Sequence, residues 1–433
     1  MFTQLFGNYL VEQSIITTEQ RDAFQKELLE TRVKLGTIAV ADGLLTEAQA
    51  DEINHAQTQQ DRRFGDIAVD LGYLTDSQVS ALLGKQGDVA MKFYQLLTDH
   101  TALSMDEIME HLNGFRRAHG FTDEELEALK KDDFDSIIPL FATVKDAAIT
   151  DLAGLVMRNL TRFVTSDFYF GRMKKATDYS YSMLGGQKAV GDFGIYVGFG
   201  ASLELDGIIK LAKGYAKGIT ISGSDEVYDA VCEFANLNNG LLASTLSQNN
   251  TFIDMLPPEV YLNQQVSGNA YYMPVYIQGS EFDLIISTDS DFAPGANPRA
   301  LNISKTALNT DVESSLPRVL VVDDSALIRK ILIKLLSENG YNVVGEATNG
   351  AEGVELYKEV KPDLVTLDIT MPVMDGVEAL KHIKEFDPDS KVAMISAAGQ
   401  KDKLMEALKC GAKLFITKPF SEPDVLKSLK SIK

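Results

Sequence analysis

The sequence predicts a multidomain α/β protein with three different architectures along one chain. A threefold repeat with a spacing of 29 residues opens the chain and favours an all-α module over residues 1–86. Mixed periodicity favours a central α+β domain over residues 146–290. Short β-branched runs separated by helical segments favour a doubly wound, five-stranded parallel sheet over residues 317–433. A chain of 433 residues is long enough for two to four separate cores.

The opening repeat is defined by a Thr-x-x-Gln motif. Thr17, Thr46 and Thr75 follow one another at a spacing of 29, as do the apolar-glycine pairs Phe6-Gly7, Leu35-Gly36 and Phe64-Gly65. In Thr-x-x-Gln the hydroxyl accepts an amide of the first helical turn and the Gln side chain reaches back, so each copy predicts a capped helix. Because so small a unit cannot bury its apolar face alone, we expect the three copies to pack on one another.

Two further segments join the predicted domains. Residues 87–145 are helical in pattern and polar, which is typical of a connector. Residues 291–316 are rich in Pro, Ser, Thr and Asn and predict a linker. The elements expected in the central domain are, in order, a helix over 147–163, a strand over 195–201, helices over 205–217 and 225–245, and a hairpin over 271–277 and 282–287.

Charge and composition exclude several classes of function. The net charge is −21, and residues 317–433 contribute 17 basic and 18 acidic side chains, so the negative excess lies upstream. A nucleic-acid-binding domain needs a basic face, so no nucleic acid is expected as a partner. No apolar run is long enough for membrane insertion, and the N-terminus lacks the pattern of a secretory signal. Cys232 and Cys410 are expected as core residues rather than a disulfide, and the protein as cytoplasmic.

Five polar residues follow the apolar strands of the C-terminal domain. The run RVLVV ends in Asp323-Asp324, LVTL in Asp368, VAMI in Ser396, and KLFIT in Lys418. Since ligands of parallel sheets bind beyond the carboxyl ends of the strands, all five are expected at one edge. Three carboxylates at one edge repel one another unless a hard cation lies among them, and Mg²⁺ suits them. Asp368 is then a nucleophile for a phosphoryl group, whose oxygens Lys418, Ser396 and the cation would stabilise.

This set, together with the run from Asp368 to Gly376 (DITMPVMDG) and the sequence Thr417-Lys418-Pro419-Phe420, resembles the CheY-like response regulator receivers over residues 317–433. The resemblance implies phosphorylation of Asp368 by a CheA-like histidine kinase, a cis Lys418-Pro419 bond, and Phe415 as the rotating aromatic of the switch. The metal ligands that it implies are Asp323, Asp324, Asp368 and the Thr370 carbonyl. A receiver fold that has lost its chemistry is the alternative, although every required position is filled.

A second candidate site lies in the central domain, where the segment YDAVCEFANLNNGLLAS carries Glu233 and Asn236 three residues apart. On a helix these side chains share a face, which alone is equally typical of a solvated surface. The surrounding sequence, with Asp229 before the motif and Leu256-Pro257-Pro258 after it, resembles the CheX and CheC phosphatases over residues 146–290.

That resemblance implies that Glu233 contacts the lysine of a phosphorylated CheY-like receiver. It also implies that Asn236 orients the water that attacks the aspartyl phosphate. We therefore expect both side chains to be solvent-accessible, with one site per chain. A non-catalytic, dimer-forming descendant of this fold is the alternative.

The N-terminal repeats resemble the MshEN-type module of type II secretion and pilus-assembly ATPases, some members of which bind cyclic di-GMP. The matching residues are Arg63, Gly65, Gly72, Leu83 and Gln86 in the third repeat, and Lys34, Gly36, Gly43 and Gln57 in the second. Leu5 and Leu28 replace the Arg and Gln in the first repeat, which is expected to bind nothing. The alternative is a module for packing or protein docking.

The leading hypothesis is a two-component response regulator of a chemotaxis or motility pathway. Its receiver would be phosphorylated by a histidine kinase, and its CheX-like domain would be a protein-aspartyl-phosphate phosphatase acting in cis or in trans, in a homodimer. None of the five histidines lies in a phospho-acceptor box, so the chain is not expected to be the kinase. The alternative is a non-enzymatic response regulator whose CheX-like and N-terminal modules dimerise and dock another protein.

Overall fold

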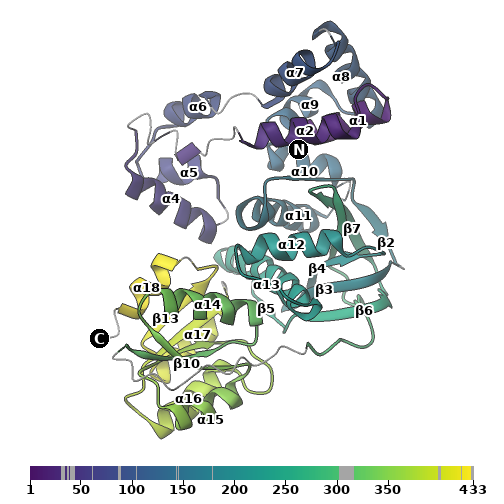
Figure 1. The fold of residues 1–433 in the computed structure, drawn as a ribbon. Helices are drawn as coiled ribbons and strands as arrows, with labels where there is room; N and C mark the ends of the chain where they lie inside the picture. The colour runs from purple at the N-terminus through teal and green to yellow at the C-terminus, as the bar shows by residue number, and fades with distance from the viewer. Residues whose placement is uncertain are drawn as a thin grey trace. The chain divides into compact units, whose positions relative to one another are not determined.

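The computed structural model describes residues 1–30, 35–36, 39, 44–60, 62–85, 89–103, 105–142, 144, 146–177, 179–301, 316–397, 401–420 and 422–430 (Figure 1). The chain forms two compact units. The first unit contains Met1–Lys174 and Tyr272–Glu281, and the second contains Lys175–Tyr271 and Phe282–Lys433. This division does not follow the predicted boundary at residue 146. Among the described residues, no helix is both long enough and apolar enough to cross a membrane.

The first unit is mostly helical. Its helices are α1 (Phe2–Glu12), α2 (Thr18–Glu30), α4 (Glu47–Gln60), α5 (Phe64–Asp70), α6 (Asp76–Lys85), α7 (Val89–His100), α8 (Met105–His119), α9 (Asp123–Lys130), α10 (Phe134–Phe141), α11 (Ala147–Asn159) and the π-helix η1 (Leu160–Val164). The predicted capping boxes are confirmed at all three repeats. Thr17 N–H donates to Gln20 Oε1 at 2.9 Å, and Gln20 N–H donates to Thr17 Oγ1 at 3.2 Å. The same pair of bonds joins Thr46 to Gln49 and Thr75 to Gln78.

The three repeats find different packing partners. The second and third repeats share one apolar cluster that includes Ile53, Phe64 and Leu82, as expected. In the first repeat, the Phe6 ring of α1 lies 6.2 Å from the Phe93 ring of α7 and 5.5 Å from the Phe115 ring of α8. Part of the segment that the sequence suggests as a connector therefore completes the core of the first repeat.

An antiparallel sheet forms the central part of the second unit. Its strands are β3 (Ser180–Gly191), β4 (Ile195–Ala201), β5 (Ile253–Met255), β6 (Glu259–Gln265) and β8 (Ser280–Ser287), with helices α12 (Asp206–Ala216) and α13 (Ser224–Gln248). β3 pairs with β4, β5 and β6, and β4 also pairs with β8. Three other strands are β1 (Phe168–Phe170), β2 (Lys174–Ala176) and β7 (Ala270–Ile277), and residues 168–170 of β1 pair antiparallel with residues 275–277 of β7.

The long strand β3 is absent from the elements expected from the sequence. Its centre is the pair Gly185-Gly186, which in isolation is typical of a turn. In the structure a Cβ on Gly185 would lie 3.1 Å from Val231 and 3.5 Å from Cys232, both on α13. Glycine in a strand interior marks such a close approach of another element. Here it allows α13, which carries both candidate phosphatase residues, to lie directly on the sheet.

The chain after β8 stays attached to the sheet. Ser267 and Ala293 form an isolated antiparallel bridge, and Arg299 N–H donates to Val260 O at 2.7 Å. The Arg299 guanidinium also lies 2.7 Å from Asp225 of α13. The first part of the predicted linker is thus bound to the central domain, and residues 302–315 lie outside the described residues.

The C-terminal domain is a doubly wound α/β fold. Its elements are β9 (Arg318–Val322), α14 (Ala326–Glu338), β10 (Asn342–Ala347), α15 (Gly350–Val360), β11 (Leu364–Asp368), α16 (Gly376–Phe386), β12 (Val392–Ala397), α17 (Lys401–Lys409), β13 (Leu414–Lys418) and α18 (Glu422–Lys430). The strand order is β10-β9-β11-β12-β13 and every pair is parallel, which confirms the predicted five-stranded sheet.

Alternate residues of each strand point to opposite faces of this sheet. Val319 and Val321 belong to a core with α14 and α18, whereas Leu320 and Val322 belong to a core with α15, α16 and α17. Both faces are covered, which explains the continuous apolar runs. The polar residues that follow the strands therefore emerge at the one edge that the helices leave open.

Candidate functional site

The carboxyl edge of the C-terminal sheet brings together the predicted residues of this domain. Asp323 is fully buried, Asp368 is 4% exposed, and Ser396 is fully buried. The Lys418 ammonium lies 3.0 Å from Asp323 Oδ2 and 2.9 Å from Asp368 Oδ1. Asp368 Oδ2 accepts the Thr370 N–H at 2.8 Å, so the loop after β11 orients this carboxylate. The edge is thus arranged around Asp368, with a lysine already beside it.

Burial and charge crowding raise the pKa values of the carboxyls at this edge. Burial, opposed by Lys418 and reinforced by Asp323, raises the pKa of Asp368 to about 6. Burial and the carboxylates of Asp368 and Asp323 raise the pKa of Asp324 well above its usual range. Although burial alone would lower it, the surrounding carboxylates raise the pKa of Lys418 well above its usual range. The cluster therefore carries more negative charge than one lysine compensates.

Two side chains that sequence reasoning missed support the acidic loop after β9. Arg329 of α14 is 1% exposed and donates to the backbone carbonyls of Asp323 at 2.8 Å and Asp324 at 3.1 Å. Its Nε lies 2.9 Å from Glu346 Oε2 on β10. An Arg six residues after an acidic residue is a weak signal by itself. Only the fold shows that this pair anchors the loop.

Residues 319–430 match the response regulator receiver domain family. The chemotaxis protein CheY of Thermotoga maritima is 51% identical over 115 residues, which cover 27% of this chain and 96% of that protein. The chain belongs to the response regulator receiver family. CheY of Bacillus subtilis is 51% identical over 112 residues, covering 26% of this chain and 93% of that protein. A chain of the crystal structure of the CheX-CheY-BeF3-Mg+2 complex from Borrelia burgdorferi is 41% identical, with 29% of this chain and 95% of that chain covered and a TM-score of 0.27.

Receivers of the CheY type generally bind Mg²⁺, and the donor set of this receiver suits that ion. Carboxylate oxygens are the ligands that hard divalent cations prefer. The buried Asp323 Oδ2 accepts no hydrogen bond from any described residue, and Lys418 is its ion-pair partner. Among the described residues, no three acidic, histidine or cysteine side chains are gathered as a metal site, and Lys418 bridges Asp323 and Asp368.

The structure also describes the predicted cis bond, Phe415 and Ser396. The Lys418-Pro419 bond is cis. Phe415 is half-buried and packs against the core that contains α15, α16 and α17. The buried Ser396 hydroxyl has no hydrogen-bond partner among the described residues. A Cβ on Gly376 would lie 1.9 Å from the Asp368 carbonyl oxygen, so the loop after β11 closes tightly on Asp368.

Glu233 of α13 is buried and interacts electrostatically with the charged side chains of the receiver. It is 6% exposed, which makes the expectation of a solvent-accessible Glu233 wrong. Burial raises its pKa to about 8, while Lys418 lowers this pKa and Asp323 and Asp368 raise it. The side chain is buried because α13 packs against the receiver of the same chain. That association depends on two complementary surfaces, which a motif on one helix does not reveal.

Asn236 lies one turn further along α13 and is partly exposed. Its Oδ1 accepts a hydrogen bond from Gln187 Nε2 at 2.9 Å, and the same Nε2 donates to Leu256 O at 2.9 Å. Gln187 Oε1 accepts from Asn239 Nδ2 at 3.0 Å. Gln187 is 1% exposed, so a buried amide network fixes the orientation of the Asn236 amide. Nothing in the sequence motif identifies Gln187, because it lies on β3, 49 residues before Asn236, and meets α13 only in the fold.

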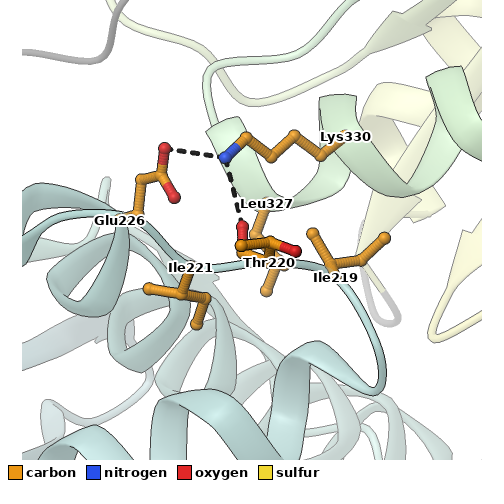
Figure 2. Close-up of a pocket in the computed structure, with 6 residues that line it drawn as sticks. All are labelled: Ile219, Thr220, Ile221, Glu226, Leu327 and Lys330. Atoms are coloured by element: carbon orange, nitrogen blue, oxygen red, sulfur yellow. Dashed lines mark hydrogen bonds and ion pairs between the residues drawn. The ribbon is translucent and has the colours of Figure 1, made fainter.

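The first turns of α13 also contact the receiver. Asp229 Oδ2 accepts from Ser325 Oγ at 3.0 Å and from Leu327 N–H at 2.9 Å. Glu226 Oε1 lies 2.7 Å from Lys330 Nζ (Figure 2). Burial raises the pKa of Asp229 to about 6, although its two receiver donors lower it. Sequence reasoning used Asp229 as part of a resemblance without giving it a partner.

The cyclic di-GMP candidates that the structure describes make other contacts. Arg63 pairs with Asp135, and it also lies 3.3 Å from Asp133. A Cβ on Gly65 would lie 2.6 Å from Val79, and one on Gly36 would lie 3.2 Å from the Phe64 ring, so both glycines serve close packing. Gln57 is half-buried. Lys34, Gly43 and Gln86 lie outside the described residues.

Proposed function

We propose that Asp368 accepts a phosphoryl group from a histidine kinase and that α13 of the same chain promotes its removal. The observation that carries this proposal is the burial of Glu233, which is 6% exposed on the helix whose Asp229 bonds to Ser325 and Leu327 of the receiver. Asn236 lies on the same helix, three residues further on. A binding module without catalytic function would not need an acidic side chain buried where the receiver carboxylates Asp323 and Asp368 raise its pKa, because such burial is costly.

The reaction is a hydrolysis of an acyl phosphate. Water adds to phosphorus through its oxygen, the bond from phosphorus to the Asp368 oxygen breaks, and Asp368 leaves as a carboxylate together with inorganic phosphate. Lys418 and the Ser396 hydroxyl stabilise phosphoryl oxygens. When bound by Asp323, Asp324, Asp368 and the Thr370 carbonyl, Mg²⁺ neutralises negative charge on the same group.

The remaining requirement is an oriented water, and we assign it to Asn236. Gln187 holds the Asn236 Oδ1 from one side, which fixes where the remaining hydrogen-bonding groups of that amide point. To Glu233 we assign an electrostatic attraction to Lys418 that helps to hold α13 against the site. Positioning of a nucleophile is itself a large catalytic effect.

The direct test is single-turnover decay. The full chain is loaded from a small phosphodonor with Mg²⁺, the donor is removed, and the loss of aspartyl phosphate is followed. Asn236→Ala should slow decay about 10- to 100-fold, because water is no longer oriented. Gln248→Ala, at the exposed end of the same helix, is the matched control. Equal decay of wild type and Asn236→Ala would leave α13 as a docking element only.

Loading itself tests the phosphorylation site. Asp368→Asn should abolish incorporation of base-labile phosphate, because the amide is not a nucleophile. Chelation of Mg²⁺ should have the same effect on wild type. Persistent incorporation in Asp368→Asn would contradict this assignment.

The alternative is a response regulator whose central and N-terminal modules serve homodimerisation and protein docking. It predicts an Asn236→Ala protein with unchanged decay. For the N-terminal repeats, cyclic di-GMP binding is the competing hypothesis, and it requires Arg63 to leave Asp135. Titration calorimetry of the full chain and of Arg63→Ala with cyclic di-GMP separates these two readings of the repeats.

A further inference from the structure

We infer that the first turns of α13 form a docking surface for receiver helix α14, and that this surface selects the receiver on which Glu233 and Asn236 act. This inference rests on the proposed phosphatase function and names what it recognises. The docking surface consists of Asp229 and Glu226 on α13 with Ile219 and Ile221 in the segment before it. Its occupant is the start of α14 in the same chain, from Ser325 to Lys330.

Asp229 accepts hydrogen bonds at the N-terminus of α14. The first amides of a helix have no partner within it, and a carboxylate there satisfies them and interacts favourably with the helix dipole. Asp229 accepts the Leu327 amide and the Ser325 hydroxyl, while Ser325 Oγ accepts the Ile328 amide of its own helix at 3.2 Å. Asp229 is 6% exposed, and both of these donors belong to the receiver. Without α14 in place, this buried carboxylate would lose both bonds.

Glu226 and the neighbouring apolar side chains contact the next turn of α14. Figure 2 shows the Lys330 ammonium between Glu226 and the Thr220 carbonyl, at 2.7 and 3.4 Å. Leu327 lines the same small pocket as Ile219 and Ile221. Charge complementarity and an apolar contact therefore lie side by side, on a helix that is otherwise part of the receiver core.

The spacing on α13 connects docking to chemistry. Glu226, Asp229 and Glu233 follow one another at intervals of three and four residues, so they share one helix face. When the first two hold α14, the third points to the same side of α13 and is only 6% exposed. Recognition then requires three receiver side chains after the acidic pair Asp323-Asp324. They are a serine at the position of Ser325, an apolar residue at that of Leu327 and a lysine at that of Lys330. A receiver that lacks this pattern should dock more weakly.

Charge reversal in the full chain is the sharpest test. Glu226→Lys and Lys330→Glu should each slow the decay of the aspartyl phosphate by about fivefold, as expected for loss of a partly exposed ion pair. The double variant Glu226→Lys/Lys330→Glu should regain most of the wild-type rate. Lys334→Glu, the same charge change at an exposed position of α14, should have no effect. Slow decay in the double variant would overturn the proposed pairing.

Hydrogen exchange measures docking without activity. Asp229→Ala should raise the exchange of the Leu327 amide, because this amide loses its acceptor. Unchanged exchange over residues 325–330 in Asp229→Ala and in both charge reversals would overturn the docking surface, whatever the phosphatase assay shows. Conversely, altered exchange together with an Asn236→Ala protein that decays like wild type would support the docking surface and contradict the proposed phosphatase function. A decay rate that rises with protein concentration would place another copy's receiver on the surface and overturn the intramolecular assignment.

Discussion

At the scale of single residues, the proposed hydrolysis depends on side chains whose orientation is set by buried neighbours. Asn236 is the clearest case, because its amide could point either way without Gln187. The Gln187 amide donates to Asn236 and to the Leu256 carbonyl, and it accepts from Asn239. Each group of this buried amide is thereby satisfied, which gives the network one low-energy arrangement.

This arrangement predicts the behaviour of Gln187→Glu. An ionised carboxylate cannot donate, so the Asn236 amide should turn its Nδ2 toward residue 187. Decay of the aspartyl phosphate should slow about tenfold, while exchange of the α14 amides stays at the wild-type level. Gln187→Met, which keeps the shape and removes the hydrogen bonds, should slow decay in the same way. Wild-type rates in both variants would show that Gln187 does not orient Asn236.

At the scale of elements, local sequence patterns predicted those features that are contained within a single strand or a single helix. The receiver residues follow directly from apolar runs that end in polar residues, and the three capping boxes follow from Thr-x-x-Gln. The strand β3 could not be predicted in this way, because Gly185-Gly186 is typical of a turn until α13 is placed on it. The Arg329–Glu346 pair was missed for the same reason, since its partners are 17 residues apart and meet only in the folded receiver.

The Arg329–Glu346 pair gives a prediction at this scale. Arg329→Met should lower the stability of the receiver by about 3–5 kcal/mol, because it leaves the Glu346 carboxylate buried without its guanidinium. It should also weaken Mg²⁺ binding, because the backbone of Asp323 and Asp324 loses its support. Denaturant unfolding followed by circular dichroism and a Mg²⁺ titration measure the two effects.

A paired replacement supplies the control for this prediction. Arg329→Met/Glu346→Leu should recover much of the lost stability, since no uncompensated charge remains. It should not recover Mg²⁺ binding, because the carbonyls after β9 still lack their donor. Equal stability of wild type and Arg329→Met would contradict the structural role of the pair.

At the scale of the whole molecule, the sequence indicated the parts but not their association. The motif around Glu233 predicted a solvent-accessible site that could engage a phosphorylated receiver in cis or in trans. In the structure Glu233 is buried, and its helix packs on the receiver of its own chain. The predicted linker over residues 291–316 also begins later than expected, because Arg299 is bound to the central domain, and β9 begins at Arg318. Short tethers favour action in cis, since they keep the local concentration of the receiver in the millimolar range.

The last prediction separates action in cis from action in trans. Fully extended chain spans at most about 3.6 Å per residue, so the 14 residues 302–315 hold the receiver within about 50 Å of its anchor. A phosphorylated Asn236→Ala chain has a substrate receiver and no oriented water. An Asp368→Asn chain has an intact α13 and no phosphate.

Mixing these two proteins at micromolar concentration should leave the slow decay of Asn236→Ala unchanged, because the receiver of each chain already occupies its own docking surface at far higher effective concentration. Adding Lys330→Glu to the Asp368→Asn chain should weaken its own receiver contact by only about fivefold, which is far less than the advantage of a millimolar over a micromolar concentration, so decay should stay slow. Fast decay in the first mixture would mean that receivers exchange between chains, as in a dimer that dephosphorylates in trans.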